Sequence, residues 1–286
     1  KIKKNNMIIW LASYPKSGNT WLRSLLASYF YSKDGSFDFD LLKNIGQFPH
    51  FNYFKDYKDN FSKPESTSDY WLKEQAKINK EKKIRFIKTH NAMCKINNNL
   101  FTDEHNSLGA IYIIRDPRNV VSSLSNHINL DINEAFEYMK NENNSFSYKK
   151  DGRYLAFVPL LSWILHQKSW INVKKFPVLT IKYEDLELKT YETFKKVLLF
   201  INEITKSNDK IDNEKLKKSI RSCNFETLQK LEKNKGFPEA WINKDKTRNL
   251  FFNLGKNNDY NKLLDKELIS QMNETFNEQI KIFNYK

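Results

Sequence analysis

Four short apolar runs, separated by segments with helical character, constrain the fold more than any other feature of this chain. They are rich in Ile, Val, Leu and aromatic residues and occupy residues 7–13, 84–88, 110–115 and 178–183. Polar and apolar residues do not alternate strictly within them, which is typical of strands covered on both faces. The alternation of strands and helices therefore predicts an α/β fold with a central, mostly parallel β-sheet flanked by helices.

Helical segments follow from the spacing of apolar side chains. This spacing predicts helices over residues 20–31, 120–127, 155–173 and 191–201. Four apolar side chains at intervals of four residues form a further stripe near the C-terminus: Leu264, Leu268, Met272 and Phe276. The aromatic-rich stretch 48–71 and the polar stretch 235–249 show weak periodicity, and we expect both to be long excursions from the core.

Length and composition limit the class of protein. A chain of 286 residues is long enough for one large domain or two small ones, and 14% aromatic residues exclude general disorder. The two cysteines, Cys94 and Cys223, are too few for a disulfide framework and are typical of a reducing compartment. Because the longest apolar runs fall far short of about 20 residues, we expect no membrane span and no secretory leader, and predict a cytoplasmic protein.

The formal net charge of +14 favours anionic partners. On charge alone these include nucleic acid, a membrane surface and small phosphate- or sulfate-bearing molecules, while an excess of solvated lysine without a ligand explains the charge equally well. The chain has no Arg-rich block, no zinc-finger pattern and no RNP motif. We therefore expect no nucleic-acid partner, and the function has to be inferred from motifs.

The first apolar run leads into a loop with the sequence Y-P-K-S-G-N-T-W at residues 14–21, after which a helix is predicted. A strand–loop–helix unit points backbone N–H groups and a helix N-terminus at one spot and so forms an anion site. Gly18 permits close approach of a ligand to the backbone, and Lys16 adds a point charge. Three polar residues are expected to cap the following helix: Ser17, Asn19 and Thr20. Taken alone, the segment also fits an ordinary turn with an exposed lysine.

This octapeptide resembles the 5′-phosphosulfate loop of the cytosolic-type sulfotransferases, usually written Y-P-K-S-G-T-T-W. Those enzymes use 3′-phosphoadenosine 5′-phosphosulfate (PAPS) and release adenosine 3′,5′-diphosphate (PAP). The resemblance implies a P-loop-like site in which Lys16 and the residues that follow it hold the phosphosulfate while Trp21 lies against the adenine. Asn19 stands where the family usually has Thr, a change that preserves hydrogen bonding.

A second motif follows the third run, where Arg115 at the strand end precedes Ser123 by eight residues. Arginine binds phosphate through two parallel hydrogen bonds, and a serine hydroxyl can complete the site. The spacing resembles the family's 3′-phosphate motif and implies that both residues bind that phosphate. In isolation, an Asp-Pro turn with Arg115 in a structural ion pair would explain the segment as well.

The second run ends in Lys88-Thr89-His90. Carboxyl ends of parallel strands face the ligand crevice, and an imidazole with an ordinary pKa near 6.5 suits removal of a proton from a hydroxyl or amine. The segment resembles the family's catalytic tip, which implies His90 as general base and Lys88, together with Lys16, as charge-stabilising groups. The other histidines are expected to be structural or on the surface: His50, His105, His127 and His166.

The adenine is expected to meet residues from two later segments. Tyr183 begins a Y-E-D sequence that resembles a strand end of the family whose Tyr contacts the nucleotide. Cys223 and Phe225 lie in a segment similar to the family's T-S-F-x, with Leu228 one turn further on, so Phe225 would cover the adenine opposite Trp21. Stacking of this kind contributes about 1–3 kcal/mol per base. Simple core packing of Phe225 is the alternative.

Residues 251–260 resemble the family's F-x-R-K-G-x-x-G-D-W loop over the 3′-phosphate and also depart from it. Four residues differ from that pattern: Asn253 and Leu254 replace the Arg-Lys pair, Asn258 replaces a Gly and Tyr260 replaces a Trp. The backbone amides of Leu254 and Gly255 are still expected to reach the phosphate, with Lys256 or Arg248 supplying charge.

The resemblance spans residues 13–260 and implies one sulfotransferase domain over residues 1–286 that needs no metal. It implies transfer of a sulfuryl group from PAPS to the hydroxyl or amine of a small-molecule, saccharide or lipid acceptor. We expect residues 48–71, 144–157 and 235–248 to build the acceptor pocket. A P-loop nucleotide kinase and a non-enzymatic basic polyanion-binding protein are the alternatives, although the Walker pattern is absent. The sequence predicts no oligomeric state.

Overall fold

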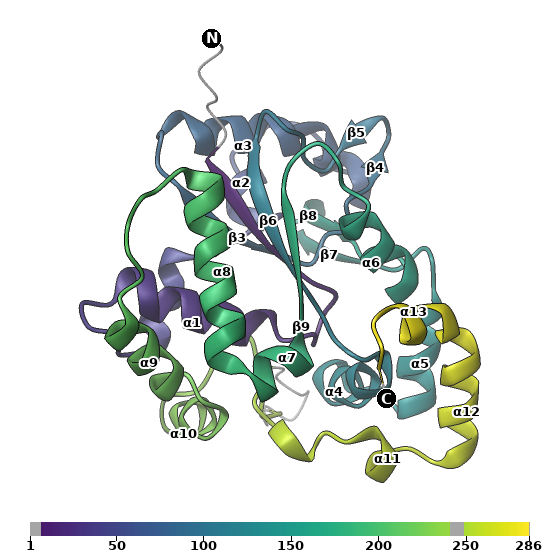
Figure 1. The fold of residues 1–286 in the computed structure, drawn as a ribbon. Coiled ribbons are helices and arrows are strands. Elements are labelled where there is room, and N and C mark those ends of the chain that lie inside the picture. The colour runs from purple at the N-terminus through teal and green to yellow at the C-terminus, as the bar shows by residue number, and fades with distance from the viewer. Residues whose placement is uncertain (1–6, 241–248, 286) are drawn as a thin grey trace.

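The computed structural model describes residues 7–240 and 249–285, and its centre is a five-stranded sheet (Figure 1). Every pair of neighbouring strands in this sheet is parallel. The order across it is β2 (Gly46–Gln47), β3 (Arg85–Thr89), β1 (Ile8–Ala12), β6 (Ser107–Ile114) and β9 (Val178–Lys182). The predicted α/β fold with a mostly parallel central sheet is thus confirmed. Strand β2, only two residues long, was missed because so short a segment leaves no hydrophobic pattern.

Helices cover both faces of the sheet, and each face has its own hydrophobic core. Ile9 and Leu11 of β1 pack with buried side chains of α1 (Asn19–Tyr31), α8 (Thr190–Thr205), α9 (Asn213–Ser222) and α10 (Phe225–Lys235). Trp10 and Ala12 face the other core, which includes side chains of α3 (Trp71–Lys80), α4 (Pro117–Ile128), α5 (Ile132–Lys140) and α6 (Trp163–Ile171). Alternate residues of one strand therefore anchor two layers of helices.

The remaining elements are short. They comprise α2 (Phe51–Phe54), β4 (Lys95–Ile96), β5 (Asn99–Leu100), α7 (Tyr183–Leu188), α11 (Tyr260–Leu263), α12 (Lys266–Thr275), α13 (Asn277–Ile282) and the 3-10 turns η1 (Phe39–Asn44), η2 (Pro64–Tyr70) and η3 (Gly255–Asn257). The predicted C-terminal stripe is buried throughout, but it is divided among α12 and the residues that flank it. Within the described part of the chain, no helix combines the length and the hydrophobicity needed to cross a bilayer.

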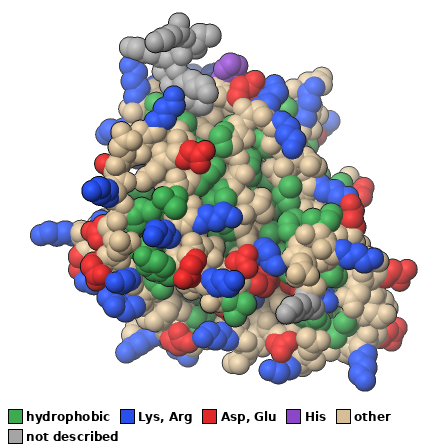
Figure 2. Space-filling model, viewed as in Figure 1, with side chains coloured by type: hydrophobic (Ala, Val, Ile, Leu, Met, Phe, Trp, Pro, Cys, Tyr) green, Lys and Arg blue, Asp and Glu red, His purple; other side chains and the backbone are tan. Residues whose placement is uncertain are grey.

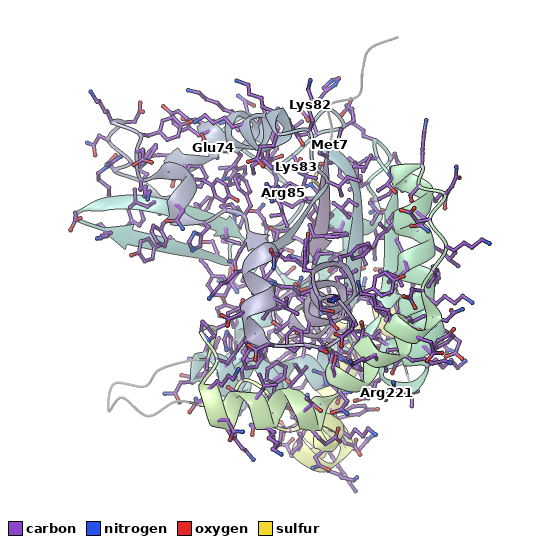
Figure 3. All side chains as sticks on the ribbon, turned by 90° about the vertical axis from the view of Figure 1, so that its left-hand side faces the viewer. Met7, Glu74, Lys82, Lys83, Arg85 and Arg221 are labelled. Carbon is purple, nitrogen blue, oxygen red and sulfur yellow. The ribbon has the colours of Figure 1, made fainter. Side chains whose placement is uncertain are left out.

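One predicted helix is wrong in its first half. Residues expected to begin a helix at 155 instead form β8 (Arg153–Pro159), which pairs antiparallel with β7 (Ser145–Lys150). Helix α6 starts only at Trp163, where the Ser162 hydroxyl accepts a hydrogen bond from Leu165 N at 3.3 Å. The spacing of apolar residues in this stretch fits a helix locally, but pairing with β7 decides the conformation. Figure 3 shows this hairpin projecting from the side of the molecule.

The parallel sheet brings four loops together. At its amino-terminal edge Met7 and Arg85 lie side by side (Figure 3), joined by a hydrogen bond from Arg85 N to Met7 O of 2.9 Å. At the opposite edge β1, β3, β6 and β9 all end, so the residues that follow each strand converge on one region. In parallel α/β sheets, ligands bind at this edge.

Candidate functional site

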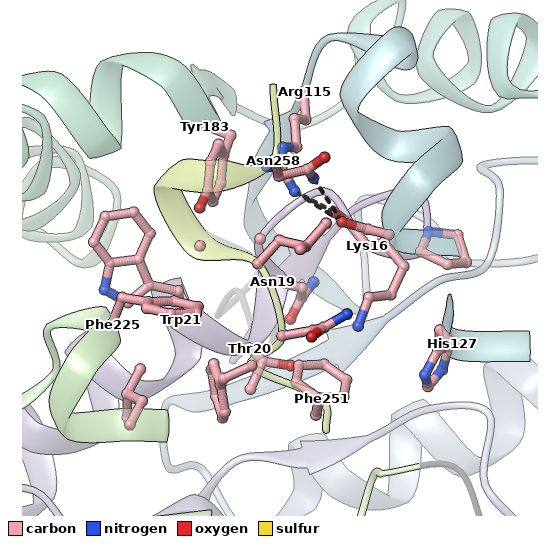
Figure 4. Close-up of a pocket in the computed structure, with 18 of the residues that line it drawn as sticks. Lys16, Asn19, Thr20, Trp21, Arg115, His127, Tyr183, Phe225, Phe251 and Asn258 are labelled. Atoms are coloured by element: carbon pink, nitrogen blue, oxygen red, sulfur yellow. Dashed lines mark hydrogen bonds between the residues drawn. The ribbon is translucent and has the colours of Figure 1, made fainter. Parts of the chain in front are cut away.

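A cavity of about 540 Å³ opens at the carboxyl edge of the sheet (Figure 4). Most of the residues singled out from the sequence line it: Lys16, Gly18, Asn19, Thr20, Trp21, Lys88, His90, Arg115, Ser123, Tyr183, Phe225, Leu228, Leu254, Gly255 and Lys256. Ser17 and Cys223 are buried but are not among the lining residues. Segments from near both ends of the chain, from Pro15 to Asn258, thus meet around one cavity.

The loop between β1 and α1 forms one end of the cavity. Gly18 has φ of +101°, and a Cβ atom there would lie 2.5 Å from the Tyr183 ring, so only glycine fits. The side chains expected to cap α1 do not do so. Asn19 Nδ2 instead donates to Leu11 O at 2.8 Å and to Ser13 Oγ at 3.2 Å, which fixes the loop against its strand. The first turn of α1 therefore has no side-chain cap, which suits an anion.

Lys16 extends into the cavity toward His127 and Phe251 (Figure 4). Its Nζ lies 3.5 Å from the centre of the Phe251 ring, a cation–π contact. Burial, together with repulsion by Arg115 and Lys88, lowers the pKa of Lys16 to about 7. A bound anion would favour the charged ammonium, so the affinity for the anion should increase when Lys16 is protonated.

His90 directly follows β3, and its protonation state is fixed by the backbone. Its Nδ1 lies 2.8 Å from Ser13 O. A carbonyl only accepts hydrogen bonds, so Nδ1 carries the proton and Nε2 keeps a free electron pair. Burial lowers the pKa of His90 to about 3, and the charge of Lys88 acts in the same direction. The imidazole is therefore neutral at physiological pH, and its Nε2 carries no proton.

His166 holds His90 in place through the backbone. Its Nε2 donates to His90 O at 3.1 Å, so its Nδ1 accepts from the Tyr112 hydroxyl at 3.0 Å. The ring is fully buried on α6. His166 is thus the structural residue that the sequence predicted.

Lys88 meets a carboxylate that the sequence analysis missed. Glu239 Oε2 lies 2.7 Å from Lys88 Nζ, and its Oε1 lies 2.5 Å from Arg23 Nη1. Burial raises the pKa of Glu239, but the charges of Lys88 and Arg23 outweigh it and hold this pKa well below its usual range. Burial also lowers the pKa of Lys88, and Glu239 counteracts this. Glu239 thus favours the charged form of Lys88 next to His90.

Arg115 and Ser123 come together as their spacing predicted. Arg115 Nη1 donates to Lys16 O at 3.3 Å and lies 3.5 Å from Ser123 Oγ. The guanidinium also stacks 4.0 Å from the centre of the Tyr183 ring. Asn258 donates to the same serine hydroxyl at 2.8 Å (Figure 4). The loop after β6 and the 251–260 segment therefore form one polar corner.

An aromatic corner adjoins the polar one through Tyr183, which contacts both Arg115 and Trp21. Trp21 Nε1 donates to Cys223 O at 2.8 Å, which ties α1 to the start of α10. The rings of Trp21 and Tyr183 meet edge to face at 5.7 Å. Phe225 packs beneath Gly255, where an added Cβ would lie 2.6 Å from its ring. Trp21 and Phe225 both line the cavity and give it flat apolar walls.

His127 also lines the cavity, whereas the sequence analysis placed it among structural or surface residues. It lies one turn after Ser123 on α4, so the two side chains share a helix face, and that spacing was the available signal. Its ring meets Phe251 edge to face at 5.7 Å. Burial lowers the pKa of His127 to about 3, as does the nearby charge of Lys16.

The predicted acceptor wall is only partly right. Phe146 of the predicted segment 144–157 and Glu239 of the predicted segment 235–248 line the cavity, but no residue of 48–71 does. Four aromatic side chains of that stretch are buried in the core instead: Phe48, Phe54, Phe61 and Trp71. Phe48, for example, packs against Trp10 and Phe101 at ring distances of 6.0 and 6.1 Å. Residues 241–248, including Arg248, lie outside the described part of the chain.

Comparisons with known proteins identify the family of the chain. Residues 7–284 match the family described as the sulfotransferase domain. The chain is 23% identical over 279 residues to cytosolic sulfotransferase 16 of Arabidopsis thaliana, covering 95% of this chain and 75% of that protein. It is 22% identical over 290 residues to cytosolic sulfotransferase 17 of the same plant, covering 98% of this chain and 76% of that protein.

A solved structure has the same fold. The structure of retinol dehydratase in complex with androsterone and inactive cofactor PAP matches with a TM-score of 0.59 and 17% sequence identity. The match covers 96% of this chain and 81% of that one. At this level of identity the likeness establishes the fold alone.

Proposed function

The chain belongs to the sulfotransferase domain family, and from this premise we propose that it transfers a sulfuryl group from PAPS to a hydroxyl or amine of an acceptor. One observation carries this proposal. His90, neutral and with a free Nε2, lines the same cavity as the uncapped start of α1 and the side chain of Lys16. A base and an anion site in one cavity are what in-line transfer of an anionic group requires.

The proposed reaction begins at His90, whose Nε2 accepts the proton of the acceptor. The acceptor oxygen or nitrogen forms a bond to sulfur while the bond from sulfur to the 5′-phosphate oxygen breaks, and PAP leaves with the electron pair. Lys16 and Lys88 stabilise the negative charge that develops on the transferred group and on the leaving oxygen. General-base catalysis of this kind contributes about 10²–10⁴-fold in rate.

The nucleotide is proposed to lie across the cavity. Its 5′ end meets the start of α1 and Lys16, its adenine lies between Trp21 and Phe225, and its 3′-phosphate meets Arg115 and Ser123. This order agrees with the polar and aromatic corners described above. The retinol dehydratase structure contains PAP, which supports PAPS as the co-substrate here.

The acceptor is proposed to be a small molecule, a saccharide or a lipid. Retinol dehydratase was solved with androsterone, which supports a small apolar acceptor. Phe146, Phe251 and the neutral His127 line the cavity as well, and they offer an apolar surface with one polar contact. We also propose a cytoplasmic location, which the names of the relatives support.

The proposal is tested first by calorimetry with PAP and with ATP plus Mg²⁺. A sulfotransferase binds PAP more tightly, a nucleotide kinase prefers the Mg²⁺–ATP complex, and a general polyanion-binding protein does not distinguish them. Transfer of ³⁵S from labelled PAPS onto mixtures of phenols, sterols and sugars then identifies the acceptor class.

His90→Ala tests the proposed base. Transfer to the acceptor should fall by at least about 100-fold, because the proton has no other acceptor of this kind at that position. The affinity for PAP should stay unchanged, since His90 is not proposed to contact PAP. Full activity in this variant would contradict the role of His90.

A further inference from the structure

Asn258 is a buried side chain at the polar corner of the cavity, in the position where the loop of related enzymes carries glycine. Only 8% of its surface is exposed, and its Oδ1 has no hydrogen-bond partner among the described residues. A buried amide oxygen without a hydrogen-bond partner lowers the stability of the fold. Its hydrogen bonds therefore indicate what it does.

The orientation of the Asn258 amide is determined by a backbone carbonyl. Nδ2 lies 2.9 Å from Asn119 O, and because a carbonyl only accepts, the NH₂ group must be on this side. The second hydrogen of Nδ2 points to Ser123 Oγ, 2.8 Å away. Asn119 is itself held by Tyr260, whose backbone N–H donates to Asn119 Oδ1 at 2.9 Å. Helix α4 and the 251–260 segment are thus joined at this point.

Ser123 becomes a hydrogen-bond donor toward the cavity as a result. Its Oγ is approached by two donors, Asn258 Nδ2 and, at 3.5 Å, Arg115 Nη1. With both of these on the oxygen, the hydroxyl hydrogen must point elsewhere, and no described residue accepts it. Ser123 lines the cavity, so this hydrogen is available to an anionic oxygen of a ligand.

Arg115 supplies further donors at the same place. Its Nη1 bonds to Lys16 O, whereas its buried Nε has no partner among the described residues. Stacking on Tyr183 at 4.0 Å restricts the plane of the guanidinium. A fixed guanidinium together with an oriented hydroxyl matches the geometry of a phosphate monoester.

We propose that Asn258 is a positioning residue for the 3′-phosphate of the nucleotide: by donating to Ser123 it directs the serine hydroxyl at that phosphate. It does so in a loop that has Asn253 and Leu254 where related enzymes have an Arg-Lys pair. The neutral Asn258 side chain, acting through Ser123, thus supports binding of the 3′-phosphate at a corner that lacks the Arg-Lys pair of related enzymes. This inference rests on the proposed function, because it takes the bound nucleotide to carry a 3′-phosphate.

Calorimetry with PAP and with adenosine 5′-monophosphate (AMP), which lacks the 3′-phosphate, tests the inference on the full chain. Asn258→Ala and Asn258→Gly should each weaken PAP binding by about tenfold and leave AMP binding unchanged. Asn257→Ala is the matched control, since Asn257 is its exposed neighbour, and it should affect neither nucleotide. Melting temperatures show whether each variant is folded.

A double-mutant cycle with Ser123→Ala shows whether Asn258 acts through Ser123. In the Ser123→Ala background, Asn258→Ala should have little further effect on PAP binding. An equal loss of PAP and AMP affinity, unchanged PAP affinity, or tighter PAP binding by Asn258→Gly would each overturn the inference while leaving the proposed function intact. If the wild-type protein itself does not prefer PAP over AMP, the proposed function fails and the inference fails with it.

Discussion

At the scale of single residues, the burial of Lys16 beside Arg115 and Lys88 has a consequence for pH. The pKa of Lys16 is lowered to about 7, so near neutral pH part of the unliganded protein carries an uncharged Lys16. Binding of an anion favours the charged form and therefore takes up a proton.

PAP affinity should accordingly be highest below about pH 7 and decrease as the pH rises to about 9. Calorimetry across this range, in buffers of different ionisation enthalpy, measures both the affinity and the proton uptake. Lys16→Met is the control. This variant should bind PAP more weakly, and its PAP affinity should not decrease over this pH range. Phosphate titration of PAP itself affects both proteins equally. The same decrease in the variant would contradict the assignment to Lys16.

Glu239 leads to a prediction about stability. Glu239→Gln leaves Lys88 and Arg23 buried without a carboxylate, which should lower the free energy of unfolding by about 3 kcal/mol or more. Because the pKa of Glu239 is depressed in the folded protein, its contribution is present above its unfolded pKa and is lost as the pH falls below it.

Urea unfolding at neutral and acidic pH measures this effect. The difference between wild type and Glu239→Gln should be largest at neutral pH and shrink on acidification. Glu187→Gln is a suitable control, since Glu187 lines the same cavity without an ion pair among the described residues. Equal stability of wild type and Glu239→Gln at neutral pH would contradict the prediction.

The sequence predicted those site residues that stand next to strand ends. Lys16, His90 and Arg115 each follow an apolar run, so local pattern and parallel topology are enough to bring them together. Glu239 and Asn258 could not be found in this way, because their partners Lys88 and Ser123 lie 151 and 135 residues away. Equally distant residues near 225 and 255 were predicted only because their segments resemble the family's motifs, and no motif indicated the partners of Glu239 and Asn258.

At the scale of secondary structure, the start of α1 depends on one glycine. Gly18→Ala would hold an L-residue at φ of +101°, which costs about 1–3 kcal/mol, and would push a methyl group against the Tyr183 ring. We expect lower stability and loss of PAP binding, measured by urea unfolding and calorimetry.

Gly152 provides the control for this prediction. It also has a positive φ, of +77°, but an added Cβ there would meet nothing within 4 Å. Gly152→Ala should therefore cost only the backbone strain of about 1 kcal/mol and should leave PAP binding unchanged. If both variants bind PAP like the wild type, close packing at Gly18 does not shape the site.

The elements also show where pattern reading fails. The predicted helices near 20–31, 120–127 and 191–201 correspond to α1, α4 and α8, because each has a single apolar face on one core. Residues 153–159 became a strand because β7 supplies the hydrogen bonds. A pairing partner is not visible in the spacing of one segment.

At the scale of the whole molecule, the positive charge is spread widely. Lys and Arg side chains are scattered among Asp and Glu over the face shown in Figure 2. Some of them form exposed ion pairs, such as Lys43 with Asp40 at 2.5 Å, each worth about 0–1 kcal/mol. Much of the positive charge is therefore distributed over this surface, whereas four cations among the described residues line the cavity: Lys16, Lys88, Arg115 and Lys256.

We propose that residues 1–286 fold as one domain. Alternate residues of β1 belong to the two cores, so neither core can open without exposing the other. Thermal unfolding followed by circular dichroism and by tryptophan fluorescence should give one coincident transition. A 100-fold excess of PAP over its dissociation constant should stabilise the fold by about 2.7 kcal/mol. Two separate transitions would contradict the single domain.

The projecting β7–β8 hairpin has a consequence for how such a molecule can diversify. It contributes Phe146 to the cavity, whereas the proposed nucleotide contacts come from the ends of β1, β6 and β9 and from the segments near 225 and 255. Exchange of the hairpin would change the surface offered to the acceptor and leave the nucleotide corner intact. Hairpin sequence and length are thus the natural place to engineer a new acceptor preference onto an unchanged donor site.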